Sequence, residues 1–354
     1  MNHHRDRSPS RGLVRRRFPI ALLSAVALGA GLAACGGDDE EDGEQTSALT
    51  VYSGREEELV SPLLEDFEKE TGIELKVRYG DSAELAATIV EEGENSPADA
   101  FFSQDAGALG ALQKESLLAE LPSEVFDRVD PRFRSTEGRW VGVSGRARVV
   151  AYNSEQLSET DLPDSVLDYT DEEWKGRVGW APTNSSFQAF VTAMRVTEGE
   201  DATRSWLEGI VANQPEVFVD NSSVRDAVAS GEIDVGFINH YYVAQAREEE
   251  GPDYPVAVDF PDGGDVGSLV NVAGIGLLES SDGGTAGIEL VEFLLSDESQ
   301  AFFSKETKEY PLIEGVEADP LVVPLEQIEQ PDVDLSDLDD LQGTLTLIQE
   351  AGAL

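Results

Sequence analysis

Short apolar runs alternate with amphipathic stretches along most of the chain. In the first part, apolar runs cover 49–52, 73–79 and 98–102, and the stretches between them, 56–71 and 82–92, have helical spacing. Runs of this length suit buried strands, and a helix after each strand is typical of βαβ units. The pattern predicts an α/β domain with a mainly parallel sheet.

The same rhythm continues and predicts a second lobe. Roughly 300 residues are enough for two separate cores. In open α/β sheets ligands bind beyond the carboxyl ends of the strands, so we expect a site in a cleft between the lobes. The further predicted strands cover 140–152, 177–181, 217–219, 233–238 and 270–277, and the further helices cover 186–198, 202–212, 223–230 and 284–295.

The amino terminus has the pattern of an export signal. Six arginines within residues 5–17 precede an apolar stretch, 20–34, that is too short to span a bilayer. Residues 1–34 are therefore predicted to be a signal peptide. The sequence Leu32-Ala33-Ala34-Cys35 resembles a bacterial lipoprotein signal, in which the cysteine is lipidated. Cys35 is the chain's only cysteine, which excludes an internal disulfide framework. Arg15-Arg16-Arg17 leaves both general and twin-arginine export open.

The chain is strongly acidic, with a formal net charge of −46 from 71 acidic and 25 basic residues. Such a charge argues against nucleic acid as a partner, because phosphates would be repelled. It would also enrich cations near the surface. Residues 35–47 are mostly small and acidic, and we expect them to form a disordered tether.

Two adjacent tyrosines are the strongest candidate for chemistry. Tyr241 and Tyr242 follow the apolar run 233–238 and precede a helix-like stretch, 243–247. At a helix start, successive side chains lie about 100° apart, so both phenols can reach one ligand. Two phenolates are hard oxygen donors, and only a highly charged cation such as Fe(III) would ionise them near neutral pH. The alternative is a half-buried pair that only packs under a loop.

Several segments, taken in order, resemble the ferric-iron-binding solute receptors of bacterial ABC importers. This family implies a type II periplasmic-binding fold with two mainly parallel α/β lobes joined by hinge strands. We expect lobe 1 to contain 48–147 and 272–316, and lobe 2 to contain 148–271 and 317–354. The matching segments are Leu49-Thr50-Val51-Tyr52-Ser53-Gly54-Arg55, Ser96-Pro97-Ala98-Asp99, 141–150, Gly176-Arg177-Val178-Gly179, Pro182-Thr183, Asn221-Ser222, Gly231-Glu232-Ile233-Asp234 and Ile238-Asn239-His240-Tyr241-Tyr242.

The resemblance implies roles for particular residues. Tyr241 and Tyr242 would be iron ligands, and a synergistic anion such as carbonate, phosphate or citrate would complete the metal's shell. Helix-start amides and guanidinium groups both suit such an anion. The alternative for the arginines is surface ion pairing with the abundant acids. The residues at the anion positions are Arg146, Arg148, Asn184, Ser185, Ser186, Asn221 and Asn239.

The chain departs from the family at two positions. Glu56 stands where some members have a histidine ligand, and Gln104 stands where they have a carboxylate ligand. Glu56 is therefore a candidate third ligand, or else only an acid at the positive end of a helix. Gln104 itself and Asp105 are the other candidates. We expect His240 to be a lining or surface residue.

The resulting hypothesis is a monomeric, extracytoplasmic receptor that passes Fe(III) and its anion to an ABC permease with its ATPase subunit. It would be held at the outer face of the cytoplasmic membrane by the Cys35 lipid alone. One alternative is a receptor of the same fold for an anionic organic solute such as a phosphonate. Another is an exported hydrolase, although a catalytic triad would have to use His240, and no Gly-x-Ser-x-Gly motif accompanies it.

Overall fold

The computed structural model describes residues 48–281 and 283–354. The predicted signal peptide (1–34), the tether (35–47) and Cys35 lie outside the described residues. Those described form part of one compact unit, Gln45–Leu354. Within them, no helix is both long and apolar enough to cross a membrane.

The strands form one curled sheet whose order is β2-β1-β3-β9-β4-β7-β5-β6, with β8 and β10 paired to β4. Parallel pairs link β1 to β2 and β3, and β5 to β6 and β7, whereas every antiparallel pair includes β4 or β9. The strands are β1 (Ala48–Ser53), β2 (Glu74–Tyr79), β3 (Ala100–Ser103), β4 (Val141–Asn153), β5 (Val178–Trp180), β6 (Glu216–Val217), β7 (Val235–Asn239), β8 (Val256–Asp259), β9 (Val270–Leu277) and β10 (Tyr310–Pro311).

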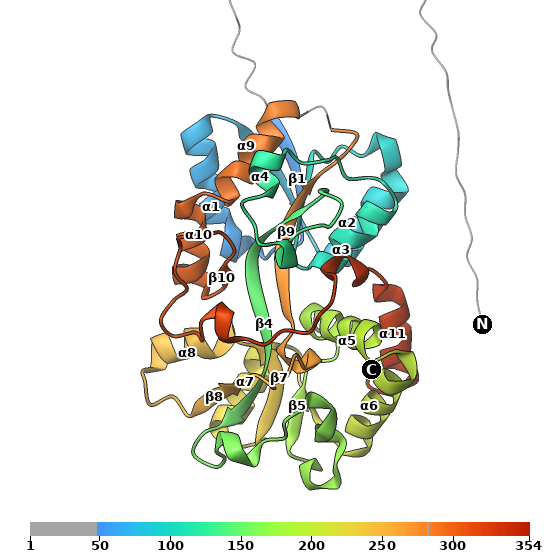
Figure 1. The fold of residues 1–354 in the computed structure, drawn as a ribbon, viewed down its shortest axis with the longest axis vertical. Helices are drawn as coiled ribbons and strands as arrows, with labels where there is room; N and C mark the ends of the chain where they lie inside the picture. The colour runs from blue at the N-terminus through green and yellow to red at the C-terminus, as the bar shows by residue number, and fades with distance from the viewer. Residues whose placement is uncertain (1–47, 282) are drawn as a thin grey trace, which may run out of the picture. The chain divides into compact units, whose positions relative to one another are not determined.

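The helices gather around two ends of the long strands β4 and β9. Figure 1 shows α1, α2, α3 and α9 around one end, and α5 to α8 with α11 around the other. This arrangement fits the predicted pair of lobes, whose boundaries remain a prediction. The helices are α1 (Glu57–Thr71), α2 (Ser82–Glu92), α3 (Ala106–Lys114), α4 (Ser123–Phe126), α5 (Ser185–Thr197), α6 (Glu200–Ala212), α7 (Asn221–Ser230), α8 (Tyr241–Glu250), α9 (Gly284–Leu294), α10 (Asp297–Phe302) and α11 (Leu341–Glu350).

β4 passes between the two groups of helices, and all 13 of its residues are buried. Its first residues pair with β9 and β10, and its last residues pair with β7 and β8. Arg146 and Arg148 are two residues apart, so their side chains leave the same face of the strand. In the register, Arg146 lies opposite Asn271 of β9, and Arg148 lies opposite Asn239 of β7.

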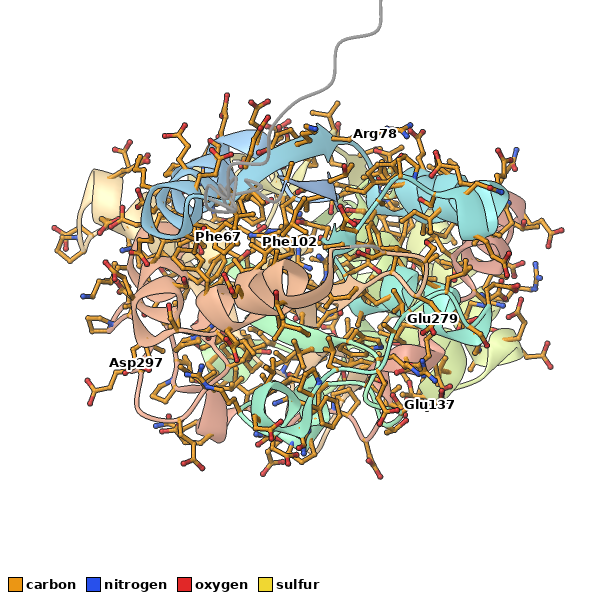
Figure 2. All side chains as sticks on the ribbon, turned by 90° about the horizontal axis from the view of Figure 1, so that it is seen from above. Phe67, Arg78, Phe102, Glu137, Glu279 and Asp297 are labelled. Atoms are coloured by element: carbon orange, nitrogen blue, oxygen red, sulfur yellow. The ribbon has the colours of Figure 1, made fainter. Side chains whose placement is uncertain are left out.

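Apolar side chains fill the interior and charged side chains cover the outside. Phe67 and Phe102 are fully buried, whereas the Asp297 side chain is 87% exposed (Figure 2). Around α5 and α6, the rings of Trp180, Phe187 and Trp206 pack with centroids 5.3–6.4 Å apart. Aromatic clusters of this kind bury large apolar areas, which fixes the start of α5 where the site is built.

The carboxyl-terminal segment crosses α3 before it ends in α11. Two glycines of α3 permit this crossing: a Cβ added to Gly107 would lie 2.2 Å from Leu338 O, and one added to Gly110 would lie 2.2 Å from Ser336 O. α11 then packs against α5 and α6. The segment therefore contacts helices at both ends of β4.

Replacing Gly110 by Ala should lower the free energy of unfolding by about 1–3 kcal/mol, because the new methyl group has no space beside the Ser336 backbone. Gly287→Ala is the matched control. There the nearest atoms are flexible Leu277 methyl groups at 3.1 Å, and alanine gains helix propensity. Chemical denaturation of both variants tests this, and equal stability of Gly110→Ala and the wild type would contradict the close crossing.

Candidate metal and anion site

The tyrosine pair begins α8, with one residue between it and the end of β7, so the pair stands at a helix start as the sequence predicted. The two rings stack with their centroids 4.3 Å apart and their planes at 30°. Tyr241 is 6% exposed, and Tyr242 is half-buried. Both phenols therefore belong to one small region that opens to solvent at Tyr242.

Burial keeps Tyr241 neutral in the protein without a ligand. It raises the pKa of the Tyr241 phenol well above its usual range, and the neighbouring Tyr242 adds to this, while Arg146 acts in the opposite direction. Ionising this phenol at neutral pH therefore requires a strong positive charge brought in by a ligand.

Arg148 is a buried cation beside the tyrosines. It is 3% exposed and donates to Ser186 Oγ at 3.3 Å, Asn239 Oδ1 at 3.3 Å and Phe237 O at 2.5 Å. Burial lowers the pKa of Arg148 to about 9, and proximity to Tyr242 and Tyr241 partly counteracts that shift.

Arg146 is 4% exposed, and its Nε and Nη1 atoms have no hydrogen-bond partner among the described residues. Within the same residues, neither Arg146 nor Arg148 forms an ion pair with a carboxylate. The alternative of surface ion pairs is therefore wrong for both arginines. Burying donors without partners lowers the free energy of unfolding unless an anion accepts hydrogen bonds from them.

The start of α5 supplies polar groups next to the arginines. Asn184 caps the helix, and its Oδ1 accepts from Ser186 N at 3.0 Å and Ser186 Oγ at 2.5 Å. Asn221 Nδ2 donates to Asn184 Oδ1 at 3.1 Å and to Ser186 Oγ at 3.3 Å, and Asn221 Oδ1 has no partner among the described residues. Ser185 is the first residue of the helix.

A small cavity brings most of the predicted anion residues together. Five of them line it, whereas Asn184 and Asn221 reach it only through their bonds to Ser186. Tyr241 and Tyr242 are not among the lining residues. The lining residues are Gln104, Asp105, Arg146, Arg148, Ser185, Ser186, Phe190, Asn239, Leu269 and Asn271.

The three candidate further ligands lie in different surroundings. Glu56 is exposed and precedes α1, and its side chain makes no capping hydrogen bond. Gln104 Oε1 accepts from Arg55 Nη1 at 3.0 Å. Asp105 caps α3 by accepting from Ala108 N at 3.1 Å, and burial raises its pKa. In the described part of the chain, no group of three His, Cys, Asp or Glu side chains could hold a metal ion.

His240 is buried, so of its two expected positions, lining or surface, the surface position is wrong. It is 3% exposed, and its ring stacks on Tyr310 with centroids 4.4 Å apart. Its Nδ1 accepts from Ala147 N at 3.1 Å, so its Nε2 carries the proton and donates to Lys308 O at 3.0 Å. Burial lowers the pKa of His240 to about 4, and the ring is neutral at neutral pH.

A family profile described as bacterial extracellular solute-binding protein matches residues 63–329. The chain belongs to this family. As in the solved structures it resembles, its fold is the type II periplasmic-binding fold, which confirms the predicted fold class.

Several relatives of this solute-binding protein are named for iron. The Fe(3+)-binding periplasmic protein of Serratia marcescens is 32% identical over 95% of this chain and 97% of its own length. Iron-bound HitA from Pseudomonas aeruginosa is 33% identical, with a TM-score of 0.80 over 86% of this chain and 99% of its own. Trichodesmium IdiA, solved with iron and citrate, is 28% identical, with a TM-score of 0.75 over 86% and 99% of the two chains.

A buried ion pair of this solute-binding protein was missed in the sequence. Arg55 Nη2 contacts both carboxylate oxygens of Glu309 at 3.0 Å, and Ser144 Oγ donates to Glu309 Oε2 at 2.6 Å. The two charged side chains are 0% and 1% exposed. Arg55 belongs to a recognised motif, but Glu309 is distant along the chain, so only the fold reveals the pair.

Glu309 remains ionised despite its burial. Burial alone would raise the pKa of its carboxyl group, but Arg55 and Arg146, with the Ser144 hydrogen bond, hold the pKa below its ordinary value. A lowered folded-state pKa contributes stability that is present above the unfolded-state pKa and is lost as the pH falls through the folded-state value.

Glu309→Gln should therefore lower the free energy of unfolding by about 3–5 kcal/mol at neutral pH, because it leaves Arg55 buried without a counter-charge. The difference from the wild type should shrink as the pH falls into the acid range. Denaturant unfolding at several pH values measures both effects. Asp66→Asn, which breaks an exposed pair with Lys69, is the control and should change little. A Glu309 variant as stable as this control would refute the buried pair's role.

Proposed function

We propose that this solute-binding protein captures Fe(III) together with a synergistic anion and delivers both to an ABC permease and its ATPase subunit. One observation carries the proposal: two stacked phenols at a helix start lie beside two buried arginines that form no ion pair within the described residues. Phenols supply ligands for a hard trivalent cation, and the arginines supply donors for an anion.

In the proposed complex, Tyr241 and Tyr242 bind iron as phenolates. Arg148 lies within electrostatic reach of both phenols, and Arg146 favours ionisation of Tyr241. The anion would sit on the unpartnered Nε and Nη1 atoms of Arg146 and on the polar groups at the start of α5. Carbonate, phosphate and citrate are the candidate anions. Closure of the two proposed lobes would complete the metal's shell.

The relatives support iron as the transported ligand. The Serratia marcescens protein is named for Fe(3+), the Pseudomonas aeruginosa structure holds iron, and the Trichodesmium structure holds iron and citrate. For a hydrolase, by contrast, His240 would have to be the general base, and both of its ring nitrogens are engaged with backbone groups. We therefore propose a transport role without catalysis.

The setting of the proposed receptor follows from the amino-terminal sequence and the family. The protein would be exported, attached to the outer face of the cytoplasmic membrane through a lipid on Cys35, and monomeric. Its acidic surface would concentrate cations near the site without binding nucleic acid.

Iron loading should produce a visible phenolate-to-iron charge-transfer band in the mature protein. Tyr241→Phe and Tyr242→Phe should each weaken iron retention by more than about 100-fold, since even outer-shell partners of metal ligands contribute about 10- to 100-fold. Tyr79→Phe, at the end of β2, is the control. The measurements are absorbance after addition of ferric citrate and iron retention against a weak chelator. A colourless wild type that retains no iron would end the proposal.

Glu56 is proposed as a third protein ligand that reaches the iron when the lobes close. Glu56→Gln should then weaken iron retention relative to Glu57→Gln, its exposed neighbour in the first turn of α1. The same chelator competition measures both variants. If the two variants retain iron equally well, Glu56 is only an acid at the helix start.

A further inference from the structure

We propose that Gln104 and Asn271 are anion-binding residues, and that with Asn239 they turn three amide NH₂ groups towards one oxyanion group. The inference rests on the proposed function. It adds residues on a second side of the cavity lined by Arg146 and Arg148, which we call the anion cavity. These residues come from the β3–α3 connection and from β9. Gln104 thereby becomes a contact of the anion and not of the metal.

The orientation of Gln104 is fixed by a partner that can only donate. Arg55 Nη1 lies 3.0 Å from Gln104 Oε1, and a guanidinium group has no acceptor. The amide oxygen must therefore face Arg55. Arg55 is itself held by both carboxylate oxygens of Glu309, so it cannot turn away without leaving a buried charge unpaired. Gln104 Nε2 has no hydrogen-bond partner in the part of the chain that the structure describes, and Gln104 lines the cavity.

The amide of Asn271, on β9, is likewise oriented by partners that can only donate. Its Oδ1 accepts from the backbone amides of Ala106 at 3.2 Å and Val272 at 2.8 Å, which are also donors only. Its Nδ2 forms no bond to another described side chain or backbone group, and Asn271 is 8% exposed beside the cavity. The sequence offers no local signal for this role, because the strand register alone sets Asn271 opposite Arg146.

Asn239 completes the set from β7. Its Oδ1 accepts from Arg148 Nη1 at 3.3 Å, and its NH₂ group has no partner among the residues that the structure describes. Arg146 adds, from β4, two nitrogen atoms, Nε and Nη1, that have no hydrogen-bond partner within residues 48–281 and 283–354. Asp105 is the one carboxylate among the lining residues, and it is engaged in capping α3. Residues from four separate segments, each with an N–H donor that lacks a partner among the described residues, thus line one small cavity.

A lining of this kind selects an oxyanion group and disfavours a bare cation. The shared chemistry is a carbonate ion or one carboxylate of an iron chelate, because both present several acceptor oxygens and no donor. A carboxylate at position 104 would repel the anion and add negative charge near the metal. The Gln104 amide instead donates a hydrogen bond to the anion and adds no charge.

The test exchanges each amide NH₂ for a carboxylate oxygen of nearly the same shape. Gln104→Glu keeps an oxygen for Arg55, and Asn271→Asp keeps one for the two backbone amides, but each turns an acceptor towards the cavity. Calorimetry with bicarbonate and with citrate on the iron-free mature protein should show affinities lowered by about 10- to 100-fold in each variant, the effect of losing one hydrogen bond to a charged group. Gln349→Glu, exposed on α11, adds the same charge and should bind as the wild type.

The bicarbonate and citrate titrations distinguish a free anion from a chelate carboxylate. Binding of bicarbonate alone identifies a free anion, whereas binding of citrate alone identifies a chelate carboxylate, and either supports the cavity. Unchanged affinity in Gln104→Glu, or a wild type that binds neither anion, overturns the proposal. If Asn271→Asp fails to fold by thermal unfolding, Gln104→Glu decides alone, since its Arg55 contact is preserved.

A second readout uses iron. Retention of Fe(III) by the wild type should depend on added anion, and Gln104→Glu should reduce that dependence, because the new carboxylate replaces part of the anion's charge. Failure of the two proposals is distinguishable. A chain that binds anions as predicted but never holds iron contradicts only the transport function, and a chain that holds iron with unaltered anion affinity in both variants contradicts only the amide cavity.

Discussion

Two guanidinium groups buried on one strand are the constraint on which the site depends. β4 has no exposed residue, yet it carries Arg146 and Arg148. Burying a charge without a partner is unfavourable by several kcal/mol, so the surroundings must supply compensation. Arg148 obtains part of it from neutral oxygens. Arg146 is attracted by the Glu309 carboxylate, but its Nε and Nη1 atoms have no hydrogen-bond partner within the described residues. An anionic ligand would supply the missing acceptors.

The segment 307–309 contacts both the helix that carries the tyrosines, α8, and the residues that hold Gln104. Thr307 O accepts from Gln245 Nε2 at 3.1 Å, and Lys308 O accepts from His240 Nε2 at 3.0 Å. These two hydrogen bonds attach the segment to α8 and to the residue that precedes it. The next residue, Glu309, holds Arg55 and through it Gln104. Lys308 has a φ of 60° after a π-helical turn, Phe303–Thr307, an uncommon conformation that aims Glu309 inwards. A structural link therefore joins the proposed iron ligands to the anion cavity.

Much of the fold was predictable because its signals are local. The strand runs at 49–52 and 270–277 and the helix at 82–92 agree closely with β1, β9 and α2. The tyrosine pair was also found locally, because a strand followed at once by a helix leaves a recognisable pattern. α11 and β10 were not predicted, since α11 is stabilised by packing on α5 and α6 and β10 is only two residues long.

The rest of the site depends on contacts between distant parts of the chain. Asn271 faces Arg146 because of strand register, and Glu309 meets Arg55 across 254 positions. The burial of His240 results from stacking on Tyr310, which no neighbouring residue foretells. Sequence patterns therefore singled out the phenols, the arginines and most of the amides as candidates, but not Asn271 or the Glu309 carboxylate.

In the proposed complex, phenolates of Tyr241 and Tyr242 bind Fe(III) beside these buried arginines. Resonance Raman spectroscopy of the iron-loaded mature protein, excited within its visible band, tests this most directly. We expect enhanced tyrosinate ring vibrations that weaken in each Tyr→Phe variant. Iron bound without any tyrosinate enhancement would contradict it.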